Sequence, residues 1–314
     1  MRTASYLIAL DWGTSSLRAA LMAADGAVLD EVSSDDGILS AAAGRGFRAV
    51  FDHVAGPWLA DHPDSVVLAA GMIGSRQGWR EAPYIACPAG FTELGEGLVS
   101  LDEHGLTLGL VPGLSAQHAD GVPDVMRGEE VQVFGALDAL GLDDGLFVLP
   151  GTHSKWVRVE NRRIVSFHTY MTGEVFALLR WQSILSRLMP DHDTTPWEEG
   201  RVVFTKACAL AAEGALLHRL FSVRSQGLLG KLPGDQQSDY LSGLLIGEEV
   251  REALALTGSP ASGHVHLICN AALFVRYQAA LSVFGVDSSA CSAQASFRGM
   301  YAMARERRLI GVLK

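Results

Sequence analysis

The sequence predicts an α/β protein built from two similar domains whose polar loops face a cleft. Near the N-terminus, LIALDWGTSSLRAALM (7–22) places two apolar runs around a turn rich in glycine and hydroxyl groups. The segment LFVLPGTHSKWVRVENRRIVSFHT (146–169) repeats the order of strand, Gly-Thr turn, strand, polar turn and strand. Helical periodicity follows each copy. Such a duplication predicts two related domains that each present a polar loop to a shared cleft.

Composition narrows the classes of function. The chain has 314 residues, enough for two ordinary domains, and 48% of them are hydrophobic. A net charge of −10 argues against nucleic acid or an anionic membrane surface as a partner. No apolar stretch reaches the ~18–20 residues of a membrane span, and the N-terminus lacks a signal-peptide pattern. The four cysteines show no metal-binding spacing. We therefore expect a cytoplasmic protein with reduced thiols.

The first half alternates strand and helix signals. Asp124 is a candidate N-cap for a helix that carries Glu129 and Glu130 in its first turn. The expected elements are a meander from residue 5 to about 32, a helix over 47–59, a strand over 64–70, a long loop over 71–90, a strand over 106–110 and a helix over roughly 127–140.

The second half repeats the meander and is richer in helix. We expect one domain over 1–142 and a second over 143–314, with a last helix at about 295–310 returning to the first domain. The further elements expected are a helix over 171–189, a charged loop over 191–200, helix and turn over 201–232, a helix over 239–256, a strand over 264–270, and helices over 271–283 and 295–308.

The first polar loop suits a phosphate. Glycine lets the backbone approach closely, and amides and hydroxyls donate hydrogen bonds to an anion. The preceding carboxylate of Asp11 suits the Mg²⁺ that accompanies a nucleotide. Taken alone, the stretch is equally compatible with an ordinary hairpin that has a polar tip. Its repetition at Gly151–Thr152 favours the phosphate interpretation.

Six further blocks make the resemblance specific. The blocks are GMIGSRQGWREAPYIACPAG (71–90), PDVMRGEEVQVFGAL (123–137), LPGTHSKW (149–156), MTGEVFALL (171–179), LFSVRSQGLLG (220–230) and DYLSGLLIGEE (239–249). With these blocks, the chain resembles the 2-dehydro-3-deoxygalactonokinase family of the actin-like ATPase and sugar kinase superfamily along essentially its whole length.

This resemblance implies two ribonuclease-H-like domains and an ATP-dependent kinase that uses Mg²⁺. The implied reaction phosphorylates the 6-hydroxyl of 2-dehydro-3-deoxygalactonate, and a homodimer is the family expectation. Two alternatives stay open. One is a kinase for another acid, such as 2-dehydro-3-deoxygluconate. The other is a nucleotide-switched regulatory ATPase of the same fold.

The resemblance also suggests nucleotide-binding residues. Asp11 matches the first acidic position of the superfamily and is assigned to the metal. Lys155 is a candidate cation for the β- and γ-phosphates, with a surface lysine as the alternative. Asn270 lies where the superfamily has a Gly-Gly pair beside adenosine, which leaves nucleotide preference open. The remaining phosphate-loop candidates are Gly13, Thr14, Ser15 and Ser16 in the first loop and Gly151, Thr152 and His153 in the second.

The general base must be a carboxylate within reach of the attacking hydroxyl. In many kinases of this superfamily a catalytic Asp opens the helix before the second phosphate loop. Asp124 takes that place here, with Glu129 and Glu130 as rivals. The same run could instead place Arg127 on the substrate.

A sugar acid needs an Arg and amide donors for its carboxylate. The loop 71–90 offers that chemistry, although Arg76 could simply brace the loop by pairing with Glu81. The predicted substrate residues are Gly74, Ser75, Arg76 and Gln77 for the carboxylate, and Trp79, Glu81 and Tyr84 for the hydroxyls and the apolar face.

Overall fold

A computed structural model describes residues 4–192, 195–257, 263–292 and 294–311. Its internal contacts divide the chain into two compact units. Unit 1 comprises the residues up to Asp144, the segment Val159–Phe167 and the residues from Ser292 onward. Unit 2 comprises Gly145–Arg158 and His168–Cys291. Unit 1 therefore draws on three separate stretches of the chain.

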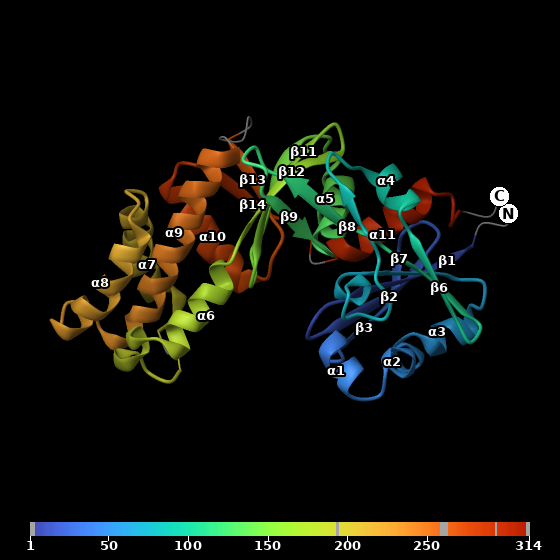
Figure 1. Cartoon of the computed structure of the whole chain (residues 1–314), viewed down its shortest axis with the longest axis horizontal. Coiled ribbons are helices and arrows are strands. Elements are labelled where there is room, and N and C mark those ends of the chain that lie inside the picture. Colours follow the sequence, from blue (N-terminus) through green and yellow to red (C-terminus); the bar gives the residue numbers. More distant parts are fainter. Residues whose placement is uncertain (1–3, 193–194, 258–262, 293, 312–314) are drawn as a thin grey trace. The chain divides into compact units, whose positions relative to one another are not determined.

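A six-stranded sheet forms the centre of unit 1 (Figure 1). Its order is β3-β2-β1-β4-β7-β6, with β1 antiparallel to β2 and parallel to β4. The N-terminal meander predicted from alternating apolar runs is confirmed. The strands are β1 Tyr6–Trp12, β2 Leu17–Ala23, β3 Val28–Ser34, β4 Val66–Ala70, β6 Val99–Glu103 and β7 Leu106–Leu110.

Helices α5 Glu129–Leu140 and α11 Ala295–Glu306 pack closely in unit 1. A Cβ on Gly135 would lie 1.8 Å from the carbonyl oxygen of Ala295, and one on Gly299 would lie 1.9 Å from that of Val131. Only glycine permits this backbone approach. The other helices of this unit are α1 Ile38–Ala43, α2 Phe47–Val54, α3 Gly56–Asp61, η1 Met72–Gly74 and α4 Phe91–Glu96.

The segment around Asp124 differs from the prediction. Instead of capping a helix, Asp124 lies in strand β9 (Pro123–Met126), which pairs antiparallel with β8 (Gly113–Gln117). A third strand, β5 (Tyr84–Ala86), completes this small sheet. Helix α5 begins five residues later, after Gly128 at φ +102°. The long-range pairing with β8 overrides the local capping signal.

Unit 2 is built on a sheet of order β12-β11-β10-β13-β14. Strand β10 pairs in parallel with β13, and β13 with β14. The far half of the β11–β12 hairpin, 159–167, is the part that groups with unit 1. The strands are β10 Gly145–Leu149, β11 Ser154–Glu160, β12 Arg163–Tyr170, β13 His264–Leu267 and β14 Asp287–Ala290.

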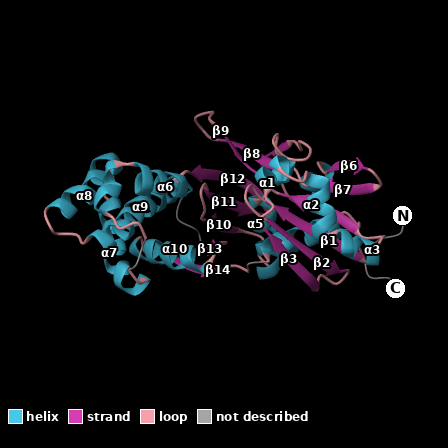
Figure 2. Ribbon diagram, turned by 90° about the horizontal axis from the view of Figure 1, so that it is seen from below, coloured by secondary structure: helices cyan, strands magenta, loops and turns pink. Residues whose placement is uncertain are grey.

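The helices of unit 2 gather around α9, which is buried along most of its length (Figure 2). Gly243 and Gly247 on α9 let the backbone of α7 come close. The predicted charged loop 191–200 is shorter than expected, because α7 already begins at Trp197. The helices are α6 Thr172–Gln182, η2 Ile184–Leu188, α7 Trp197–Ala211, α8 Leu216–Leu228, η3 Gly234–Gln236, α9 Gln237–Thr257 and α10 Ala271–Val283.

Within the described residues, no helix has both the length and the apolar character that a bilayer crossing would require.

Candidate active site

The first polar loop joins β1 to β2 in unit 1. The amide of Gly13 donates to the carbonyl of Ser16 at 2.9 Å, and the hydroxyls of the loop are exposed. Behind it, the amide of Ile38 donates to the carbonyl of Gly13 at 3.0 Å. A Cβ on Gly37 would lie 2.3 Å from the carbonyl oxygen of Thr14. The loop is thus held tightly from one side and open on the other.

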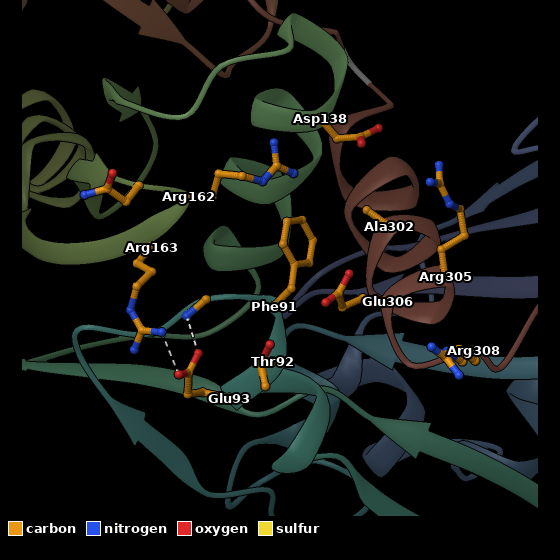
Figure 3. A pocket seen from close by; sticks show the side chains of 12 residues that line it. Phe91, Thr92, Glu93, Asp138, Arg162, Arg163, Ala302, Arg305, Glu306 and Arg308 are labelled. Atoms are coloured by element: carbon orange, nitrogen blue, oxygen red, sulfur yellow. Dashed lines mark hydrogen bonds and ion pairs between the residues drawn. The ribbon is translucent and has the colours of Figure 1, made fainter.

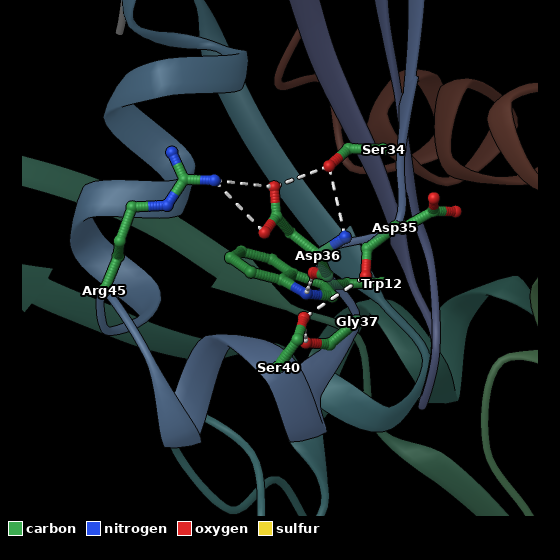
Figure 4. Close-up of polar contacts among 7 residues, drawn as sticks. All are labelled: Trp12, Ser34, Asp35, Asp36, Gly37, Ser40 and Arg45. Atoms are coloured by element: carbon green, nitrogen blue, oxygen red, sulfur yellow. Dashed lines mark hydrogen bonds and ion pairs between the residues drawn. The ribbon is translucent and has the colours of Figure 1, made fainter.

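A polar network fixes the segment behind this loop (Figure 4). Asp36 accepts a 2.6 Å hydrogen bond from Ser34 Oγ and pairs with Arg45 at 3.2 Å. Its backbone carbonyl accepts from the indole N–H of Trp12 at 2.8 Å. The Ser34 hydrogen bond is the main cause that holds the pKa of Asp36 below its usual value. These contacts connect the loop's support to the buried end of β1.

Asp11 lies near the end of β1, and its side chain is 20% exposed. Oδ2 accepts a 2.6 Å hydrogen bond from Ser296 Oγ of α11 and lies 3.6 Å from Nη2 of Arg18. Burial raises the pKa of Asp11, while the Ser296 hydrogen bond and the Arg18 charge oppose that rise. No group of three or more His, Cys, Asp or Glu side chains that could hold a metal exists among the residues described. The carboxylate of Asp11 is an oxygen donor of the kind that Mg²⁺ takes together with phosphate oxygens and water, so its chemistry fits the metal as one ligand.

Two glutamates open helix α5 in different environments. Glu130 is fully buried, and both its carboxylate oxygens accept from the amide of Gly128, at 2.9 and 2.8 Å. Burial is the main cause that raises the pKa of Glu130 to about 8, with the neighbouring charge of Glu129 adding to it. Glu129 is only partly buried, and its Oε2 accepts from the amide of Arg127 at 3.0 Å. At neutral pH Glu130 therefore keeps its proton.

Arg127 carries a buried guanidinium group. Its Nη2 donates to the carbonyl of Ala82 at 2.8 Å, and the group lies 4.3 Å from the ring centroid of Tyr84. Within the described structure, Nε and Nη1 are buried without a hydrogen-bond partner, and so is Oγ of Ser75. A Cβ on Gly74 would lie 3.0 Å from Nη1. Buried donors left unpaired are costly, so a group that accepted these hydrogen bonds would be stabilised here.

The other substrate candidates are engaged elsewhere or exposed. The indole N–H of Trp79 donates to Glu103 Oε2 at 2.6 Å, and its ring packs among the aromatic side chains of the unit 1 core. Trp79 therefore braces the fold. Asp124 lies 3.6 Å from Nε2 of His118, away from any helix start. The exposed candidates of the segment 71–90 are Arg76, Gln77, Glu81 and Tyr84.

The second polar loop joins β10 to β11 in unit 2 and packs on the start of α6. The amide of Glu174 donates to the carbonyl of Thr152 at 3.0 Å, and the carboxylate of Glu174 lies 2.5 Å from Nε2 of His153. A Cβ on Gly173 would lie only 2.4 Å from the carbonyl oxygen of Gly151. The loop and the first turn of α6 thus fit each other closely.

A pocket of about 190 Å³ adjoins this second loop. Two predicted nucleotide residues of unit 2 make structural contacts outside its lining. Lys155 is buried and donates from Nζ to Oγ1 of Thr169 at 2.7 Å. Asn270 caps α10, with Oδ1 accepting from the amide of Leu273 at 2.9 Å. The pocket is lined by Gly151, Thr172, Gly173, Phe176, Ser238, Ser242, Leu245, Ile246, Leu273, Arg276 and Tyr277.

Beneath this pocket lies a buried carboxylate, Glu249 of α9. It accepts from the indole N–H of Trp156 at 2.8 Å and from the hydroxyl of Tyr277 at 2.7 Å. Tyr277 lies in turn 2.8 Å from Ser154 Oγ, the first residue after the second loop. Burial raises the pKa of Glu249, and a hydrogen bond with Thr172 is the largest opposing effect. One carboxylate therefore connects three elements that border the pocket.

Sequence reasoning missed the supporting residues. Glu249 lies in a block that resembles the family, but an acidic residue inside a long helical pattern gives no sign of what it contacts. Ser296 carried no signal at all, because its role depends on α11 packing beside β1.

Comparison with known proteins gives consistent matches along the chain. Residues 11–303 match the sequence profile of the family described as 2-keto-3-deoxy-galactonokinase. A probable 2-dehydro-3-deoxygalactonokinase of Rhizobium meliloti (strain 1021) is 40% identical over 309 residues, covering 97% of this chain and 98% of that protein. The 2-dehydro-3-deoxygalactonokinase of Escherichia coli (strain K12) is 38% identical over 298 residues, covering 94% and 96%.

Solved structures extend the comparison to the fold. The crystal structure of a candidate 2-dehydro-3-deoxygalactonokinase from Sinorhizobium meliloti aligns with a TM-score of 0.87 at 37% identity, covering 96% of this chain and 99% of that one. An activator of the 2-hydroxyisocaproyl-CoA dehydratase from Clostridium difficile aligns with a TM-score of 0.52 at 9% identity, covering 98% and 99%. The second match concerns the fold alone.

Proposed function

The chain belongs to the 2-keto-3-deoxy-galactonokinase family, and we propose that it transfers the γ-phosphoryl group of ATP to the 6-hydroxyl of 2-dehydro-3-deoxygalactonate. The product is 2-dehydro-3-deoxy-6-phosphogalactonate, which places the reaction in galactonate catabolism. The observation that carries the proposal is the buried guanidinium group of Arg127, in which two nitrogen atoms, Nε and Nη1, have no hydrogen-bond partner among the described residues. A kinase for an uncharged sugar would have no use for it.

In this proposal Arg127 binds the substrate carboxylate. A guanidinium group offers N–H donors in a fixed planar arrangement that matches a carboxylate. Its contacts with Ala82 and Tyr84 hold the group in place before substrate arrives. The hydroxyl of Ser75, which follows Gly74, adds a third buried donor. The exposed Arg76 has no comparable support, so the carboxylate contact moves from Arg76 to Arg127.

Glu129 is the proposed general base. A base must be ionised before reaction, and a partly exposed carboxylate at a helix N-terminus favours the charged form. Glu130, with its pKa raised to about 8, keeps its proton at neutral pH and is a poor acceptor. Asp124 pairs with His118 on a β-sheet rather than opening the helix. The proton of the 6-hydroxyl would therefore pass to Glu129.

Each polar loop is proposed as the phosphate-binding loop of its own unit, and the pocket of unit 2 would take the adenosine. Loop amides and the hydroxyls of residues 14–16 supply the donors. Asp11 would hold Mg²⁺, which neutralises charge on the transferring phosphoryl group when bound. Lys155 would first have to release Thr169 before it could reach a phosphate, so phosphate binding is assigned to the loop amides. The amide nitrogen of Asn270 stays a candidate contact for the nucleotide.

A coupled ADP-release assay with a panel of acids tests the proposed function. We expect ATP consumption to rise strongly with 2-dehydro-3-deoxygalactonate and less with 2-dehydro-3-deoxygluconate. Preference for the second acid would change the substrate but keep the reaction. If no 2-keto-3-deoxy acid accelerates ATP consumption, a regulatory ATPase becomes the better interpretation.

We also infer a cytoplasmic homodimer, on the family expectation and the need for ATP. Exposed apolar side chains on the helices of unit 2, among them Trp181, Leu217 and Phe221, support self-association. Light scattering coupled to size-exclusion chromatography would measure the mass. A single species at the 33.5 kDa of one chain would contradict the dimer.

A further inference from the structure

Unit 1 contains a cavity of about 550 Å³ that the proposed reaction does not use (Figure 3). Its walls come from the turn of the β11–β12 hairpin, the start of α4, the end of α11 and one residue of α5. Four of the lining side chains are arginines, in a chain whose net charge is −10. The lining residues are Gly90, Phe91, Thr92, Glu93, Asp138, Asn161, Arg162, Arg163, Ala302, Arg305, Glu306 and Arg308.

The acidic side chains of this cavity are mostly neutralised by pairing. Glu93 pairs with Arg163 at 2.7 Å, and Asp138 pairs with Arg298 at 2.8 Å. The amide of Gly90 donates a hydrogen bond to Oε2 of Glu93, and this bond is the main cause that holds the pKa of Glu93 below its usual value. Both acids are therefore committed to local partners.

An excess of positive charge remains. Arg162 lies over the ring of Phe91, at 5.7 Å from its centroid, and its ion pair with Asp143 is long at 3.6 Å and exposed. In the described part of the chain, Arg305 and Arg308 make no ion pair with a carboxylate. Glu306 is the remaining acidic side chain that lines the cavity. Figure 3 shows that these side chains come from two different walls.

The backbone supplies an independent observation. Arg162 has φ +59° and Arg308 has φ +54°, which is the left-handed region. Arg162 follows Asn161 in the tight turn between β11 and β12, where glycine is the usual second residue. Arg308 stands just past the end of α11, at the position where glycine commonly ends a helix. Two positions that favour glycine on conformational grounds thus both carry an arginine that lines one cavity.

We propose that this cavity binds a small organic anion that carries a phosphate group. Guanidinium groups match phosphate oxygens with paired donors and stay charged at all physiological pH values. A volume of about 550 Å³ admits a metabolite of sugar size. The hairpin wall is already in position, because Arg163 also donates to the carbonyl of Pro88 at 2.7 Å, and Ala89 pairs with Ile164. Binding of such a ligand explains why Arg162 and Arg308 occupy left-handed positions that otherwise favour glycine.

Titration calorimetry on the full chain tests the site, with 6-phosphogluconate, inorganic phosphate and gluconate as probes. The test variant combines Arg162→Gly with Arg308→Gly. Both changes relieve left-handed backbone, so the melting temperature should stay the same or rise. Affinity for 6-phosphogluconate should nevertheless fall at least tenfold. The matched control is Ala215→Gly, which relieves a left-handed residue just before α8, outside the cavity, without removing a charge, and should leave affinity unchanged.

Each result is decisive. Binding of inorganic phosphate with similar affinity would make free phosphate the ligand source, whereas much weaker phosphate binding would indicate a phosphate ester. Equal affinity of the double variant and the unmodified chain would overturn the proposal, since the bound anion would then occupy the active site. Equal binding of gluconate would overturn the phosphate requirement. If the double variant does not fold, Arg305→Gln must give the affinity loss instead.

Discussion

The hydroxyl of Ser296 donates a 2.6 Å hydrogen bond to Oδ2 of Asp11, although 285 positions separate the two residues. The bond stabilises the charged form of a carboxylate that burial pushes toward the neutral form. Helix α11 therefore tunes the protonation of the group proposed to hold Mg²⁺.

Replacing Ser296 by alanine should shift the pH dependence of turnover. The loss of the donor raises the pKa of Asp11 further, so the acidic limb of the kcat profile should move to higher pH. Above that limb, kcat should recover to within about tenfold of the unmodified enzyme, the range expected for one hydrogen bond. The check is a steady-state pH profile at saturating Mg²⁺ and substrates. An unshifted limb with uniformly lower kcat would contradict this role.

Replacing Glu129 by glutamine should lower kcat by about 10²- to 10⁴-fold with little change in either KM, because the proton acceptor is lost. Asp124→Asn is the matched control and should leave kcat nearly unchanged. The assay is coupled ADP release with the sugar acid. A severe loss of turnover in Asp124→Asn, with normal turnover in Glu129→Gln, would show that Asp124 on β9 is the general base.

Glu130 should make the fold less stable as pH rises. Its pKa is about 8 in the folded state and near 4.5 when unfolded, so the folded state holds the proton over that interval and the unfolded state does not. Stability present at low pH is then lost at up to about 1.4 kcal/mol per pH unit. Denaturant unfolding at pH 5.5 and 7.5 should show a smaller pH effect in Glu130→Gln. Identical pH dependence in both proteins would show that Glu130 does not titrate this way.

Replacing Arg127 by lysine should raise KM for the sugar acid about ten- to hundredfold and leave KM for ATP unchanged, because the planar pair of donors is lost. Arg76→Lys provides the control and should alter neither constant by much. Steady-state kinetics with each substrate varied in turn separate the two constants. A rise in the ATP constant alone would place Arg127 on the nucleotide.

Replacing Gly173 by alanine should raise KM for ATP. The new Cβ would lie 2.4 Å from the carbonyl oxygen of Gly151, and two backbones must separate to admit it. The second polar loop would then shift. Gly56→Ala, whose Cβ would meet only the Asp52 side chain at an ordinary 3.9 Å, should change neither KM nor kcat. Unchanged ATP kinetics in Gly173→Ala would argue against this loop as a phosphate site.

Elements with a clear local period could be predicted from the sequence. The meander and α10 (271–283) follow from alternating or helical apolar patterns with recognisable turns at each end. Strands β8 and β9 could not be found this way. Each is short, and each depends on a partner that is distant in the sequence or on a turn of weak composition. The prediction that Asp124 caps a helix is wrong for this reason, because Pro and Asp before an apolar run also fit a helix start.

The candidate site likewise contains features set by local sequence and features set by tertiary contacts. Polar loops at strand ends, such as Gly13–Ser16, depend on local turn chemistry and were predicted. The sequence makes Arg127 a substrate candidate but offers no means of ranking it above Arg76. The proposal prefers Arg127 because its side chain is buried, and burial is a property of the packed structure. Ser296 and Glu249 acquire their roles only through tertiary contacts.

The assembly of unit 1 from three stretches bears on how the protein is made. Strand β1 leaves the ribosome early in synthesis, but α11, which covers α5 and supplies Ser296 to Asp11, is translated only after all of unit 2. Contacts between residues so far apart in the sequence form late, and they make folding slower. During translation the face of α5 that carries Gly135 therefore stays uncovered by α11, and a nascent chain cannot complete the environment of Asp11 until residue 296 has emerged.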